Sequence, residues 1–156
     1  MKKVLKGGTV VGGSGSVRAD VLIDGEKVAA VGTGEEMERL ADEDTQIVDV
    51  EGCLLFPGFI DAHTHFDLHV AGTVTADDFA TGTRAAVRGG TTTIVDFGTQ
   101  YEGESLADGL RNWHEKADGK CSCDYGFHMS ISDWNPSVSR ELDDMMEPES
   151  PPLSCT

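Results

Sequence analysis

The chain is poor in basic residues and has no long apolar run. Only 12 lysine and arginine residues stand against 28 aspartate and glutamate residues, giving a formal net charge of -16. Such a charge disfavours nucleic-acid phosphates and anionic membranes as partners. No apolar run approaches the ~18 residues of a membrane span. Gly7 and Gly8 follow directly on the first six residues, so the N-terminus has no apolar stretch that could serve as the core of a signal peptide. We therefore expect a cytoplasmic protein that binds neither nucleic acid nor membranes.

Cysteines are too few for a disulfide framework in a chain of this length. Cys121 and Cys123 form a Cys-x-Cys pair, while Cys53 and Cys155 stand apart. A Cys-x-Cys pair could be half of a thiolate metal site, but no second pair completes it. Free, reduced thiols are the expected state.

The hydrophobic pattern divides the chain into two regions and a tail. Residues 1–52 contain short strand patterns with Gly-rich turns and predict a small β-sandwich. Residues 53–147 alternate strand and helix patterns, which predicts parallel βαβ units and an α/β fold. In this region we expect strands at Leu54–Ile60, Thr91–Phe97 and Tyr125–Ser132, and helices opening at Thr75, Ser105 and Ser137. Residues 148–156 form the tail, and the whole chain is short for a closed eight-stranded β/α barrel.

Two histidines one residue apart, His63 and His65, are the clearest chemical signal. They follow the apolar run Leu54–Ile60, which predicts a buried strand. Because residues i and i+2 of a strand project to the same side, both imidazoles are expected on one face. Imidazole is a common zinc ligand, and two supply half of a tetrahedral set. The spacing alone also arises by chance.

Other candidates carry weaker signals. Asp96 is expected at the carboxyl end of its strand, where β/α barrels place their active sites. Asp61 either orients an imidazole or is a structural carboxylate. His128 is expected to be a packed, hydrogen-bonded strand histidine, and His69 and His114 ordinary surface or partly buried residues.

The run Pro57–Asp67 resembles the signature of the cyclic amidohydrolases. Two further stretches, Ala71–Phe79 and Gly89–Phe97, are similar to the dihydropyrimidinase and D-hydantoinase family. The similarity extends from about Val4 to Met146. It implies an N-terminal β-sandwich followed by the first three βα units of an incomplete TIM-like (β/α)8 barrel.

The resemblance also implies a function. Family members hydrolyse dihydropyrimidine or hydantoin rings, which are cyclic ureides, to N-carbamoyl amino acids at a binuclear Zn2+ site, and they are homo-oligomers. His63 and His65 match two histidines that bind the more buried metal. Phe66 and Val70 lie in a loop, Phe66–Gly72, that matches one lining the pocket for the substrate's substituent, and residues around Gln100 match a second such loop.

The family's other catalytic groups are not found in this sequence. They are a bridging lysine, two more histidines, a proton-handling aspartate and an oxyanion-binding tyrosine, all of which come later. Lys120 is the last lysine here and His128 the last histidine. No catalytic residue is therefore assigned, the zinc site is incomplete, and we expect an N-terminal fragment that is inactive alone and prone to self-association or aggregation.

The tail, 148–156, departs from the family. A one-base shift of the reading frame near Pro148 would replace a family-like G-V-T-S-F-K-L-Y-M by E-S-P-P-L-S-C-T, which is the sequence Glu149–Thr156. Sequencing the gene beyond this point tests the hypothesis. Two alternatives stay open: a non-catalytic binding or scaffold protein of the same fold, and a small binding protein with an isolated two-histidine metal site.

Overall fold

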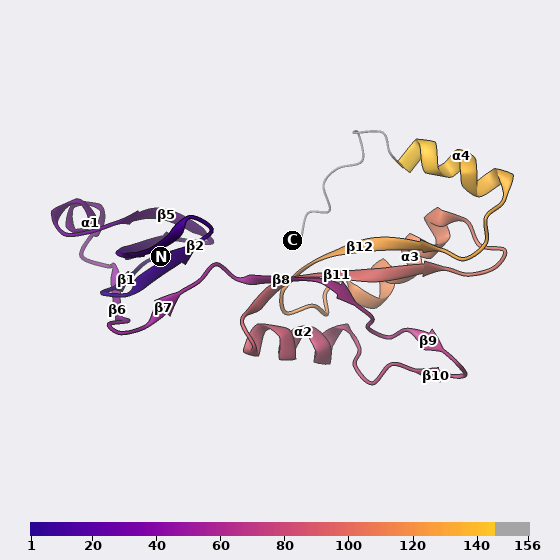
Figure 1. Cartoon of the computed structure of the whole chain (residues 1–156), viewed down its shortest axis with the longest axis horizontal. Helices are drawn as coiled ribbons and strands as arrows, with labels where there is room; N and C mark the ends of the chain where they lie inside the picture. The colour runs from indigo at the N-terminus through magenta and orange to yellow at the C-terminus, as the bar shows by residue number, and fades with distance from the viewer. Residues whose placement is uncertain (146–156) are drawn as a thin grey trace. The chain divides into compact units, whose positions relative to one another are not determined.

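The computed structural model describes residues 1–145, apart from the side chains at 35, 38 and 143–145 (Figure 1). Its contacts separate two units, Met1–Pro57 and Gly58–Thr156, and each is described by itself. The domain limits 1–52, 53–147 and 148–156 stay predictions. The tail and its reading-frame hypothesis lie outside the described residues.

The first unit contains two sheets and one helix. Its elements are β1 (Lys2–Lys6), β2 (Thr9–Gly12), β3 (Gly15–Arg18), β4 (Asp20–Asp24), β5 (Lys27–Gly32), α1 (Glu35–Leu40), β6 (Gln46–Asp49) and β7 (Leu54–Leu55). The sheets have the orders β5-β4-β1-β6 and β3-β2-β7. Val4, Leu22 and Met37 form a buried cluster, because alternate residues of β1 and β4 share a face with α1.

The second unit is built on a parallel sheet, which confirms the α/β class. Its elements are β8 (Phe59–Thr64), β9 (His69–Val70), β10 (Thr73–Val74), α2 (Phe79–Arg88), β11 (Thr91–Gln100), α3 (Leu106–Ala117), β12 (Asp124–Ile131) and α4 (Pro136–Met145). The sheet order is β12-β11-β8, and both neighbours of β11 run parallel to it. A short hairpin, β9–β10, follows β8 (Figure 1).

The central strand β11 separates the two faces of this sheet. From Ile94 onward its even-numbered residues are buried and its odd-numbered ones are only partly covered. Helices α2 and α3 lie against the even face, where Phe79, Ile94, Trp113 and Ala117 form the core cluster. The odd-numbered residues Val95, Phe97 and Thr99 lie on the opposite, odd face of the strand.

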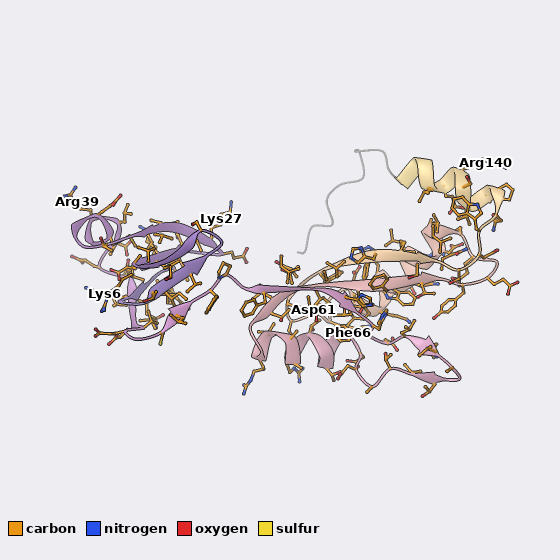
Figure 2. The ribbon with its side chains drawn as sticks, in the orientation of Figure 1. Lys6, Lys27, Arg39, Asp61, Phe66 and Arg140 are labelled. Atoms are coloured by element: carbon orange, nitrogen blue, oxygen red, sulfur yellow. The ribbon has the colours of Figure 1, made fainter. Side chains whose placement is uncertain are left out.

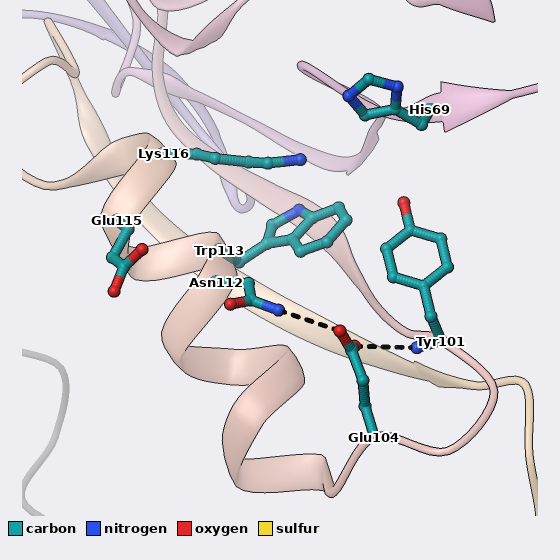
Figure 3. A pocket seen from close by; sticks show the side chains of 7 residues that line it. All are labelled: His69, Tyr101, Glu104, Asn112, Trp113, Glu115 and Lys116. Carbon is teal, nitrogen blue, oxygen red and sulfur yellow. Dashed lines mark hydrogen bonds between the residues drawn. The ribbon is translucent and has the colours of Figure 1, made fainter.

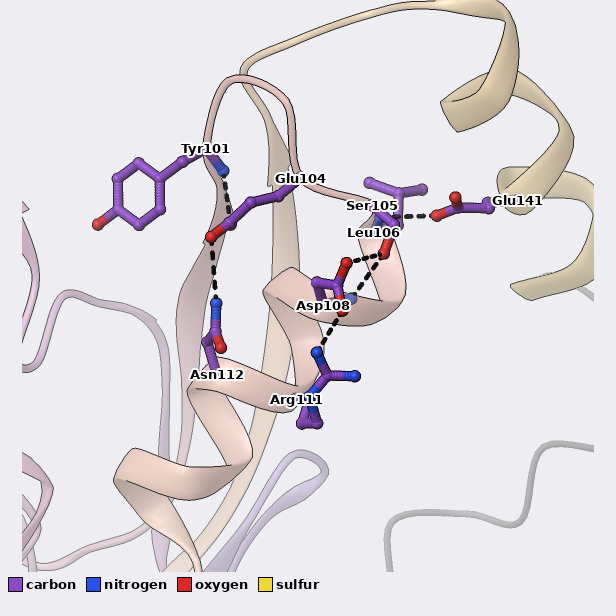
Figure 4. Close-up of polar contacts among 8 residues, drawn as sticks. All are labelled: Tyr101, Glu104, Ser105, Leu106, Asp108, Arg111, Asn112 and Glu141. Atoms are coloured by element: carbon purple, nitrogen blue, oxygen red, sulfur yellow. Dashed lines mark hydrogen bonds and ion pairs between the residues drawn. The ribbon is translucent and has the colours of Figure 1, made fainter.

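Helix α3 is fixed at its start by side chains (Figure 4). The Ser105 hydroxyl accepts a 3.0 Å hydrogen bond from the Asp108 N–H, a regular N-cap. The Leu106 N–H donates to a carboxylate oxygen of Glu141 on α4 at 2.6 Å, and Arg111 pairs with Asp108. The start of α3 therefore agrees with the sequence prediction.

Two predicted boundaries are wrong. The expected strand Leu54–Ile60 is split: β7 pairs with β2 in the first unit and β8 with β11 in the second. Pro57 lies between them and has no N–H for a sheet ladder. Helix α2 is capped by Asp78, which accepts the Thr81 N–H at 2.7 Å, and not by Thr75.

The Thr75 hydroxyl has a different partner. It accepts the Leu68 N–H at 3.0 Å, which ties the chain after β10 to the loop before β9. Within residues 1–145, none of the helices is both long and apolar enough to cross a membrane.

Candidate metal centre

The His63 and His65 imidazoles meet at the carboxyl end of β8. Their Nε2 atoms are 3.1 Å apart and the rings are nearly perpendicular, at 81°. Two nitrogens on one tetrahedral zinc, with bonds of about 2.0–2.1 Å, would be about 3.3 Å apart. Both side chains are exposed. The pair therefore fits two corners of the shell of a single ion, and the two rings lie together as the i, i+2 spacing predicts.

Phe97 of β11 lies against both imidazoles. Its ring centroid is 4.5 Å from that of His63 and 5.3 Å from that of His65. On the other side it is 5.1 Å from the ring of His128, its register partner on β12. His128 is exposed, so its prediction as a packed residue is wrong. The three parallel strands thus bring three histidines around one phenylalanine on the odd face.

The two aspartates near the pair have backbone and packing partners. Asp61, whose side chain is labelled in Figure 2, accepts the His63 backbone N–H with Oδ1 at 3.1 Å and so bonds to the main chain of that residue. Asp96 is fully buried, and its side chain accepts from Thr64, Phe66 and Trp113. It lies on the helix-covered face and not, as expected, at the strand end beside the imidazoles.

The loop Phe66–Gly72 is held at one end and exposed at the other. The Phe66 ring packs edge-on against Phe79, with centroids 5.7 Å apart, and belongs to the border of the core. Val70 is 52% exposed in β9. Ala71 and Gly72, with φ of 50° and 77°, form the turn of the hairpin, a conformation that glycine adopts readily. The substrate-loop roles of Phe66 and Val70 stay predictions.

A cavity of about 490 Å³ lies between this hairpin, the end of β11 and α3 (Figure 3). Its lining residues are His69, Tyr101, Glu104, Asn112, Trp113, Glu115 and Lys116. Neither histidine of the pair lines it, so it is separate from the candidate metal centre. Sequence reasoning did not predict this cavity, because the helical spacing of Trp113 indicates only burial.

Lys116 and Tyr101 define the electrostatics of the cavity. The Lys116 ammonium lies 4.1 Å from the Trp113 ring centroid and donates to the Asp67 carbonyl oxygen at 2.7 Å. Burial raises the pKa of the Tyr101 hydroxyl, and the negative charges of Glu104 and Asp67 raise it further. Tyr101 therefore stays a neutral hydroxyl across the physiological range.

The remaining candidate ligands do not gather around a further site. Within residues 1–145, no group of three or more His, Cys, Asp or Glu side chains could hold a metal ion. Cys53, Cys121 and Cys123 are not joined in disulfides, and Cys155 lies outside the described residues. His114 pairs with Asp118 at 3.0 Å on the surface of α3. The described chain thus supplies two ligands to a candidate centre and not a complete set.

Known proteins resemble this chain over nearly all its length. The family model described as "Amidohydrolase family" matches residues 54–147. The D-hydantoinases of Streptomyces coelicolor and Geobacillus stearothermophilus are 45% and 44% identical, over 94% and 96% of the chain. A crystal structure of dihydropyrimidinase from Brevibacillus agri superposes with a TM-score of 0.87 at 50% identity, covering 96% of this chain and 31% of that one. The chain spans 31% of the length of both curated relatives.

Proposed function

Because the chain belongs to the amidohydrolase family, we propose that it is the N-terminal, metal-binding part of a hydantoinase or dihydropyrimidinase. The reaction assigned to the intact protein is hydrolytic opening of a cyclic ureide, a dihydropyrimidine or hydantoin, to an N-carbamoyl amino acid. The observation that carries the proposal is the 3.1 Å separation of the His63 and His65 Nε2 atoms at the end of β8. The names of the similar proteins supply the substrate class.

We further propose that the second unit contributes the first three βα units of a TIM-like (β/α)8 barrel. The parallel order β12-β11-β8 and the helices on one face support this arrangement. In such a barrel the odd face of β11 would look inward, toward the imidazoles. The two sheets of the first unit support its assignment as a β-sandwich.

The residues of this chain have separable roles in the proposed centre. His63 and His65 hold a divalent ion, proposed to be Zn2+, and Phe97 limits the rotation of both rings through its contacts with them. When bound there, such an ion would supply a Lewis acid that lowers the pKa of water to about 7 and polarises the ring carbonyl. Phe66 anchors the loop that carries Val70 toward the substrate's substituent. Two imidazoles do not fill a zinc shell, so we expect no hydrolysis by this chain alone.

Metal binding by the chain tests the centre directly. Purified protein is titrated with Co2+ and followed by visible absorption, which reports nitrogen ligation. We expect His63→Ala and His65→Ala each to weaken Co2+ binding at least ~10-fold, because each removes one of the two imidazoles of the proposed centre. His69→Ala, an exposed histidine of the same unit, is the matched control and should bind as the parent does. Equal affinity in all four proteins would overturn the metal centre.

A chimera tests the reaction. Residues 1–147 replace the corresponding segment of the Geobacillus stearothermophilus D-hydantoinase, to which the chain is 44% identical, and hydantoin hydrolysis is measured. We expect activity in the chimera and its loss in the chimera carrying His63→Ala. A folded chimera that binds metal and does not act on hydantoin or dihydrouracil would refute the proposed substrate class.

The cytoplasmic location and the homo-oligomeric state stay predictions from the sequence and the family resemblance. Self-association of the chain is checked by size-exclusion chromatography with light scattering. We expect species larger than the monomer, because the sheet face that carries the imidazoles also carries Phe97 and Val95, which the described residues cover only in part.

A further inference from the structure

Asp96 is a buried carboxylate with three donors directed at it. It is 0% exposed, and its Oδ2 accepts the Thr64 hydroxyl at 2.7 Å and the Phe66 N–H at 2.9 Å. Its Oδ1 accepts the Trp113 indole N–H at 3.0 Å. A buried charge is costly unless it is fully hydrogen-bonded. Both oxygens of this carboxylate have hydrogen-bond donors, and two of the three donors belong to residues adjacent to His65 in the sequence.

Two of those donors flank His65 in the sequence. Thr64 precedes it and Phe66 follows it, so one carboxylate oxygen accepts a side-chain hydroxyl from one neighbour of His65 and a main-chain N–H from the other. Because Thr64 faces Asp96 on the helix-covered side, its neighbours His63 and His65 project to the opposite face. The orientation of both imidazoles thus depends on which way Thr64 points.

The pairing of β8 is irregular just before this point. Asp61 is paired with Ile94 and Thr64 with Asp96, so β8 has one residue more than β11 across this interval. A bulge of this kind can redirect the following side chains and weakens the local ladder. The two hydrogen bonds that Asp96 accepts, from the Thr64 hydroxyl and the Phe66 N–H, hold the end of β8 and the start of the next loop beyond the irregularity. Trp113, which is itself fully buried on α3, holds the carboxylate from the other side.

We propose that Asp96 is a positioning residue: through Thr64 and Phe66 it holds the His63–His65 imidazoles in the arrangement that binds a divalent cation. Asp96 does not contact the ion or the substrate. The inference rests on the proposed function for its metal, but its geometric content concerns the imidazoles themselves. It also explains why a carboxylate lies within the core of a sheet.

The test compares two threonines of the second unit. Thr64→Val removes the hydroxyl that donates to Asp96 and keeps the shape of the side chain. Thr83→Val is the matched control, because the Thr83 hydroxyl is also buried and bonds to the Phe79 carbonyl and the Ser122 N–H. Both variants lose hydrogen bonds to the main chain or a carboxylate, and both should melt at a lower temperature. Asp96→Asn serves as a second, stronger variant.

Two readouts separate positioning from general destabilisation. In the metal-free protein, NMR detects nuclear Overhauser effects between the ring protons of His63, His65 and Phe97, at a temperature where circular dichroism shows each variant folded. The second readout is Co2+ affinity. We expect Thr64→Val and Asp96→Asn to lose the His63–His65 ring contacts and to bind Co2+ at least ~10-fold more weakly, while Thr83→Val keeps both.

Retention of the ring contacts in folded Thr64→Val would overturn the inference and leave Asp96 as a structural residue. If the parent protein binds no Co2+, the proposed metal centre fails, but the ring contacts still decide whether Asp96 positions the imidazoles. If Asp96→Asn does not fold, Thr64→Val carries the test. The two proposals can therefore fail separately.

Discussion

Replacing Gly82 with alanine would place a methyl group where the ring of Phe66 now lies. A Cβ added at Gly82 would be 2.3 Å from Phe66 Cε1 and 2.6 Å from Cζ. Ordinary van der Waals contacts of a Cβ are 3.4–4 Å. The ring has little room to move, because its other side packs against Phe79. The close approach of α2 to the loop after β8 thus requires glycine at this position.

Two opposing effects set the size of the change. Alanine in place of glycine in a helix interior stabilises by ~1 kcal/mol. Overpacking a core costs about 1–3 kcal/mol, and this overlap is severe enough for the upper part of that range. We therefore expect Gly82→Ala to lower the free energy of unfolding by about 1–2 kcal/mol. Helix propensity alone predicts a change of the opposite sign, which makes the experiment decisive.

Urea unfolding followed by tryptophan fluorescence measures the change, because Trp113 is fully buried. Gly126→Ala in β12 is the control: no atom lies within 4 Å of its added Cβ, and its φ is not positive. Adding Phe66→Leu to the Gly82→Ala variant should recover part of the loss, since the shorter side chain vacates the space. A Gly82→Ala protein as stable as the parent would refute the packing argument.

Two other features of the second unit give measurable effects. Lys116→Met removes the ammonium that donates to the Asp67 carbonyl and lies over the Trp113 ring. We therefore expect faster limited proteolysis at the loop after β8. The control is Lys120→Met on the surface, which should leave the proteolysis rate unchanged. Hydrogen bonds from Thr81 hold the pKa of Asp78 below its ordinary value of 3.8, so its ionised cap stabilises α2 above that pH and is lost as the pH falls through the lowered pKa. Stability measured from pH 5 downward should therefore decline more steeply in the parent than in Asp78→Asn, and parallel curves would contradict this.

Much of the second unit could be predicted because its signals are local. The β-branched run that begins at Thr91 follows Gly89-Gly90. The glycines indicate the end of a helix and the β-branched residues indicate a strand, so both signals predict a strand after a helix. The i, i+2 spacing of His63 and His65 likewise needs only strand geometry. The prediction of a single strand at Leu54–Ile60 failed because it rested on the apolar character of the run. Pro57 has no backbone N–H to donate to a sheet ladder, and the strand is interrupted there.

The remaining features depend on contacts between distant residues. Asp96 meets Thr64 and Trp113 only because parallel pairing and the packing of α3 bring them together. The hairpin β9–β10 was not predicted, since its strands are two residues each and its turn contains Ala71 at positive φ, a residue that does not indicate such a turn. The cavity beside it follows from the same packing.

The alternation along β11 has a consequence for engineering this chain. Randomising Thr93, Val95 and Phe97 would vary the side that faces the imidazoles while leaving the hydrophobic packing under α2 and α3 in place. Randomising Ile94 and Asp96 would mostly yield insoluble protein. A selection for folded, soluble protein should therefore accept changes at Thr93, Val95 and Phe97 and reject most changes at Ile94 and Asp96.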